Sequence, residues 1–157
     1  MKIARVLGLA VFVGMWPVCA AAQEAFDACD VFTAKDAEAA LGTAANEATV
    51  FKGKRPKVVM ACNYTGSKDG RNVAASAQFR FARTEADMRQ SFADARMELQ
   101  TKPLFIDGNE AFWSARTGQL YVRKGRAWMT LAVGPDKQTE RDLDTARRLA
   151  EALVKKL

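Results

Sequence analysis

The sequence contains no histidine among its 157 residues. Without an imidazole, the chain cannot form a Ser–His or Cys–His nucleophile pair, a zinc site with histidine ligands, or a histidine pH switch. It also lacks a glycine-rich phosphate loop, a Gly-x-Ser-x-Gly turn and a cluster of metal-ligating side chains. We therefore predict a protein that is not an enzyme and holds no metal or cofactor. Catalysis by carboxylates or lysine is the alternative that these absences leave open.

Long apolar runs are scarce as well. The run at residues 6–16 falls well short of the ~20 residues that a membrane-spanning helix needs. Lys2 and Arg5 precede this run, Pro17 ends it, and three alanines follow at 20–22. This layout is typical of a bacterial secretory signal. We expect residues 1–22 to be cleaved and residues 23–157 to form a single disulfide-stapled domain.

Cleavage would change the charge and the cysteine count of the chain. It removes two basic residues, which leaves 22 basic and 18 acidic residues and lowers the net charge from +6 to +4. Cys19 is removed as well, and because Trp16-Pro17-Val18 does not match a lipid-attachment signal, we predict no lipid anchor there. The expected location is the periplasm or the extracellular medium, with no transmembrane span after processing.

Two cysteines remain, Cys29 and Cys62. Two cysteines in an exported domain usually pair, because that compartment is oxidising. The bond would close a loop of about 33 residues and contribute roughly 3.5–4 kcal/mol through the entropy of the unfolded chain. A redox-active pair is the alternative, but the Cys-x-x-Cys spacing that lowers a thiol pKa is absent. We predict a structural disulfide.

Local patterns predict an α+β fold. Three Thr-x-x-Asp segments, beginning at Thr33, Thr84 and Thr139, are typical of helix starts. Apolar or alternating segments with turn residues between them predict strands near 48–51, 58–64, 73–81, 111–114, 120–123 and 127–133. The expected order is α-βββ-α-βββ-α, with helices packed on an antiparallel sheet of about six strands. The second helix is expected over 85–101, before Pro103.

Three motifs together resemble a family of small exported bacterial proteins of unknown function, many of them lipoproteins. They are the segment from Cys29 through Thr33 to Leu41-Gly42, the Cys62-Asn63-Tyr64 strand, and the Gly108-Asn109-Glu110-Ala111 segment with Val122 to Gly125 after it. The resemblance implies a Cys29–Cys62 bridge and a compact α/β sandwich of the kind seen in PsbP-like domains. It brings no established activity.

Two basic groups are candidate binding sites. Lys52, Lys54, Arg55 and Lys57 lie in a predicted hairpin loop, and Arg123, Lys124 and Arg126 lie at a second one. Such groups can bind phosphate, anionic lipid or an acidic protein face. A solvated loop that protects a sheet edge is the alternative interpretation of the first group. We predict no nucleic-acid partner, because export removes the chain from most nucleic acid.

Two further features are candidate sites. Asp107 and Glu110 form a close carboxylate pair of the type that hydrolyses glycosides, but Asp-Gly-Asn is also ordinary turn chemistry, which we favour. Trp113 is a candidate interface anchor, with core packing as its alternative role. From these features we expect a periplasmic or secreted domain that recognises a protein partner, as an inhibitor, immunity or envelope accessory protein does. A binder of anionic lipid or of a small molecule is the alternative.

Overall fold

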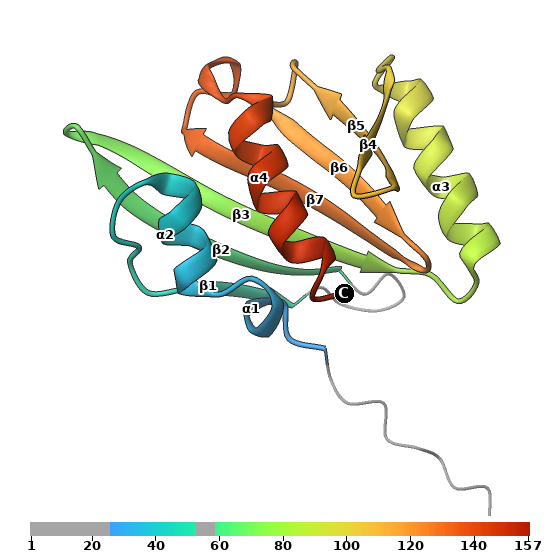
Figure 1. The fold of residues 1–157 in the computed structure, drawn as a ribbon, viewed down its shortest axis with the longest axis horizontal. Coiled ribbons are helices and arrows are strands. Elements are labelled where there is room, and N and C mark those ends of the chain that lie inside the picture. Colours follow the sequence, from blue (N-terminus) through green and yellow to red (C-terminus); the bar gives the residue numbers. More distant parts are fainter. Residues whose placement is uncertain (1–25, 53–58) are drawn as a thin grey trace, which may run out of the picture.

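A computed structural model describes residues 26–52 and 59–157 (Figure 1). The predicted signal segment and Lys54, Arg55 and Lys57 of the first basic loop lie outside the described residues. The helices are α1 (Ala28–Val31), α2 (Ala34–Leu41), α3 (Glu85–Glu98) and α4 (Leu143–Val154), with a short 3-10 turn, η1 (Gln138–Glu140). The strands are β1 (Thr49–Lys52), β2 (Val59–Lys68), β3 (Arg71–Phe81), β4 (Pro103–Ile106), β5 (Asn109–Ser114), β6 (Gln119–Lys124) and β7 (Ala127–Pro135).

The strands form one antiparallel sheet in the order β1-β2-β3-β7-β6-β5-β4. The predicted α+β class and antiparallel sheet are therefore confirmed. The described residues contain seven strands where about six were expected, because β4 precedes the three strands predicted after the second helix. The sequence gives little indication of β4, because this strand has four residues and begins with Pro103, a residue that typically ends a preceding helix.

The helices cover both faces of the sheet. Along each strand, side chains alternate between the two faces. One set of alternating residues, which includes Phe79, Leu120 and Leu131, packs with α1, α2 and α4 in the main core. The helices α2 and α4 lie across this face of the sheet (Figure 1). The other set includes Phe112 and Trp128, which pack with α3 in a second, smaller aromatic cluster.

Two of the three predicted helix starts are confirmed. At Thr33 a capping box is present, and at Thr84 the side chain accepts a hydrogen bond from the Asp87 N–H at 3.1 Å. The third prediction was wrong, because Thr139 lies in η1 and Asp142 caps α4 through a 2.8 Å bond from the Thr145 N–H. Asp142 directly precedes the apolar stripe of α4, so its carboxylate is placed to accept that bond.

The second helix is shorter than predicted. Its last helical residue is Glu98, whereas the pattern extended it to residue 101. Gln100 has a positive φ of 51°, which no continuing right-handed helix accommodates. Met88 and Phe92 are the buried residues of this helix.

Gly118 sits in the turn between β5 and β6 at a position where a side chain does not fit. Its φ is +58°, and an added Cβ would collide with the carbonyl oxygen of Gln138 and lie 2.9 Å from Cδ of Arg141. At Gly125, which has a similar φ of +54°, no atom lies within 4 Å of such a Cβ. The two glycines therefore differ in crowding but not in backbone conformation.

We expect Gly118→Ala to lower the free energy of unfolding by about 1–3 kcal/mol more than Gly125→Ala does, as overpacking typically costs. Both substitutions carry the strain of a left-handed alanine, so their difference isolates the collision with η1. Urea denaturation of the two variants measures it. Equal losses of stability would show that η1 moves aside without cost.

Candidate functional site

The second basic group is largely occupied by internal contacts. Arg123 is only 10% exposed in its side chain and donates to Glu110 at 3.0 Å and to Glu85 at 3.3 Å. The ammonium of Lys124 donates to the Val154 carbonyl at 2.7 Å, at the C-terminal end of α4. These two side chains therefore tie α3, β5 and α4 to β6. Trp113, the aromatic candidate, is half-buried and packs against the main core.

Arg126, by contrast, is exposed, and its guanidinium donates to the Arg83 carbonyl at 3.3 Å. Arg126 lies in the turn between β6 and β7. The strand register places this turn at one end of the sheet, because successive pairs cross it from β6 to β2: Arg123 with Trp128, Trp128 with Arg80, and Arg80 with Val59. Lys52 and Val59, which flank the first basic loop, lie at that same end. The end of β1, the start of β2 and the β6–β7 turn thus lie on one rim of the sheet.

We call this rim the basic end and define it by three exposed arginines, Arg80, Arg83 and Arg126. The Arg80 guanidinium lies 5.0 Å from the ring centroid of Trp128. The sequence does not indicate Arg80 and Arg83 as a site, because Arg80 lies near the end of β3 and Arg83 just after it, without a local cluster of charge. Only the register of β3 and β7 brings them to Arg126. Exposed apolar side chains lie on the same strand and on the edge strand β1: Phe81 (39% exposed), Val50 (45%) and Phe51 (57%).

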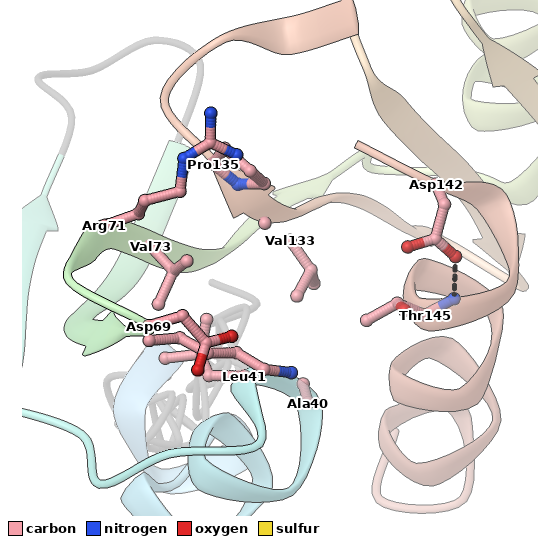
Figure 2. A pocket seen from close by; sticks show the side chains of 11 residues that line it. Ala40, Leu41, Asp69, Arg71, Val73, Val133, Pro135, Asp142 and Thr145 are labelled. Atoms are coloured by element: carbon pink, nitrogen blue, oxygen red, sulfur yellow. Dashed lines mark hydrogen bonds between the residues drawn. The ribbon is translucent and has the colours of Figure 1, made fainter. Parts of the chain in front are cut away.

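A different surface feature lies between α2 and α4. Two cavities of about 240 and 470 Å³ share Ala40 in their lining and together form what we call the interhelical groove. Figure 2 shows the cavity at its upper end, where Asp142, which caps α4, and Thr145 on α4 face Ala40 and Leu41 on α2. A third cavity, of about 440 Å³, is lined by Trp113 with Leu104, Leu143, Lys102 and Arg116.

No family model, no curated protein and no solved structure matches this chain. Within residues 26–52 and 59–157, no group of three or more Cys, Asp or Glu side chains could hold a metal ion. No helix among these residues is long and apolar enough to cross a bilayer.

The carboxylate pair that was weighed as a glycosidase site belongs to a turn. Asp107 has a positive φ of 46° and connects β4 to β5 together with Gly108. The two carboxylates engage different cations, Asp107 with Lys155 at 4.0 Å and Glu110 with Arg123 at 3.0 Å. This pairing agrees with the structural interpretation of the segment as turn chemistry.

The lower end of the interhelical groove is closed by a charged clamp. The Lys156 ammonium donates to the Asp36 carboxylate at 2.6 Å and to the Val31 carbonyl at 3.1 Å. Burial acts to raise the pKa of Asp36, but hydrogen bonds from Lys156 and Thr33 outweigh it and hold the pKa below its usual value. The clamp joins the start of α2 to the end of α4, so the two helices lie antiparallel.

Two other groups near the helices have shifted pKa values. At the start of α4, the hydrogen bond from the Thr145 N–H, opposed by burial, lowers the pKa of Asp142. Below α1 and α2, burial raises the pKa of Tyr64, and the negative charges of Asp36 and Asp27 add to that effect. These shifts follow from helix capping and core packing, and neither requires a bound ligand.

We expect Asp36→Asn to lower the free energy of unfolding by about 1 kcal/mol at pH 7, because it weakens both the cap of α2 and the clamp. Since the folded-state pKa of Asp36 is lowered, its stabilisation is present above about pH 4 and is lost as the pH falls through the folded value. Urea unfolding at neutral and acidic pH should show that acidification lowers the free energy of unfolding less in the variant than in the wild type. Asp136→Asn, at an exposed position, is the control. If acidification lowered the free energy of unfolding equally in Asp36→Asn and the wild type, Asp36 would not be the group responsible.

Proposed function

We propose that this chain is an exported, non-enzymatic binding domain that recognises a protein partner with an acidic surface. Depending on that partner, the chain would act as an inhibitor, an immunity protein or an envelope accessory protein. The observation that carries the proposal is the basic end, where Arg80, Arg83 and Arg126 are exposed together. Within the described residues, none of their guanidinium groups forms an ion pair with a carboxylate, so their charge is available to a partner.

Arginine is suited to such a contact. Its planar guanidinium binds carboxylates with two parallel hydrogen bonds and is more weakly hydrated than an ammonium group. Arg80 is also held in place by the Trp128 ring, which reduces the side-chain entropy lost on binding. Phe81, the next residue of β3, points to the opposite face of the sheet, where its ring contacts that of Phe26 at a centroid distance of 4.7 Å.

The disulfide supports the proposed location. Cys29 and Cys62 are bonded in the structure, with a Cα–Cα distance of 5.2 Å. Disulfides of this kind persist in oxidising, extracytoplasmic compartments. The cleaved signal at residues 1–22, the periplasmic or secreted location and membership of the exported bacterial family remain part of this proposal, and they rest on the motifs described above.

The proposal is tested with a triple variant, Arg80→Gln, Arg83→Gln and Arg126→Gln, of the mature protein. A matched control removes three exposed cations elsewhere, Lys102→Gln, Arg116→Gln and Arg147→Gln. In cross-linking pull-downs from envelope extract at low and physiological salt, we expect one saturable partner that the first triple variant binds at least about tenfold more weakly and the control binds normally. Thermal denaturation confirms that each variant is folded.

Three results would overturn the proposal. One is the absence of any saturable partner, and another is equal weakening in both triple variants, which would show a response to net charge alone. The third is saturable binding of the wild type to anionic phospholipid vesicles with loss in the first triple variant and no protein captured. That result would assign the basic end to lipid.

A further inference from the structure

The interhelical groove is a second surface with the form of a binding site. It begins at the Asp36–Lys156 clamp and follows α4 to Asp142 at the start of that helix. At 1.5 Å per residue, this stretch of α4 is about 20 Å long. The groove therefore has the length of a helix of three to four turns.

Small side chains create the groove. Ala39 and Ala40 on α2 face Ala152 on α4, and three alanines leave a channel where larger residues would have closed the contact between the helices. Larger apolar residues form its floor, namely Leu149 near the clamp and Leu41, Val73 and Val133 near the upper end. The channel is apolar along its base and open to solvent along its top.

The charges available at its rim are mainly positive. Lys35 on α2 and Arg148 on α4 flank the lower cavity, and Lys68 flanks the upper one. Arg71 also lines the upper cavity, but it is paired with Glu140 at 3.5 Å. Of the three carboxylates that line the groove, Asp36 is held by Lys156 and Asp142 caps α4, which leaves Asp69 at the β2–β3 turn (Figure 2). A ligand of complementary charge is therefore acidic.

We propose that the interhelical groove binds an amphipathic helix with acidic flanks, supplied by the protein partner. This inference rests on the proposed function and names the element of the partner that the chain would recognise. A helix fits a channel that is open on one side, because its apolar face enters the channel while its polar face stays in water. Alanine walls favour small or medium apolar side chains on the entering face.

The groove also adjoins the basic end. Lys124 is the last residue of β6, and its ammonium group donates to the Val154 carbonyl at the C-terminal end of α4. The clamp end of the groove therefore lies at the same end of the sheet as the basic end, although Arg80 points to the opposite face, over Trp128.

The test uses a synthetic peptide of about 14 residues with Leu and Ala at helical spacing on one face and Glu on the other. A scrambled peptide of the same composition is the control. Titrated into isotopically labelled mature protein, the amphipathic peptide should cause saturable amide shifts confined to α2, α4 and the β2–β3 turn. The scrambled peptide should cause none. Shifts confined to the basic end, or identical shifts with both peptides, would overturn the inference.

Two sets of variants sharpen the result. Filling the groove with Ala39→Leu and Ala152→Leu should weaken the peptide at least about tenfold, since the added side chains occupy its path. Ala86→Leu, at an exposed alanine of α3, should leave binding unchanged. Reversing two rim charges, Lys35→Glu and Arg148→Glu, should abolish binding of the Glu peptide and restore it for a Lys version.

Failure of this inference and failure of the proposed function give different results. If the filled groove captures the protein partner normally while the Arg80, Arg83 and Arg126 variant loses it, the function stands and the groove is not its site. If the peptide binds the groove but no partner is captured from envelope extract, the helix-binding site is supported and the proposed recognition of a partner by the basic end is contradicted.

Discussion

Replacing Cys29 and Cys62 by alanine should lower the free energy of unfolding by about 3.5–4 kcal/mol. The bond spans a sequence separation of 33 residues, and without it the unfolded chain regains the entropy of that loop. In the folded state the bond ties α1 to β2. A helix of four residues is not stable alone, so α1 depends on this link and on the packing of Phe32 against Tyr64, whose ring centroids are 5.1 Å apart.

Guanidinium unfolding of the oxidised protein and of the double alanine variant measures this effect. Added reductant should destabilise the wild type by a similar amount and leave the variant unchanged, which separates the bond from other effects of reductant. Thiol labelling of the exported protein should be blocked until reductant is added. Labelling of the untreated protein, or equal stability of the two forms, would contradict a structural role.

The second large effect is expected at Phe92, where Phe92→Ala should cost about 3–5 kcal/mol. Phe92 is the central contact of α3 with the sheet, with ring centroids 4.8 Å from Phe112 and 5.5 Å from Trp128. It is 4% exposed, and its cluster is smaller than the main core. Few other side chains can therefore close the cavity that the substitution leaves.

Phe105→Ala is the matched control, because Phe105 is 64% exposed on the edge strand β4 and should contribute less than about 0.5 kcal/mol. Denaturant unfolding measures both variants, and hydrogen exchange of the α3 amides locates the change. Loss of protection confined to α3 in Phe92→Ala would show that this helix detaches before the main core unfolds. A loss of stability no larger than that of Phe105→Ala would contradict the role of the cluster.

The candidate site was less predictable than the fold. The charges of Arg123, Lys124 and Arg126 are evident in the sequence, but two of the three are engaged by Glu85, Glu110 and the end of α4. Those partners come from distant segments, so no spacing rule identifies them. The interhelical groove was not predicted either, since its alanines have ordinary helical spacing and become a channel only when α2 and α4 pack side by side.

Local sequence by itself determined the starts of two helices, the alternation of β3 and the α+β class. These features depend on contacts between residues a few positions apart, which propensity and capping describe. Tertiary structure decided that β3 pairs with β7 and that Arg80 and Arg83 join Arg126 on one rim. Both depend on the pairing and register of strands that are distant in the sequence, which no short stretch of the chain encodes.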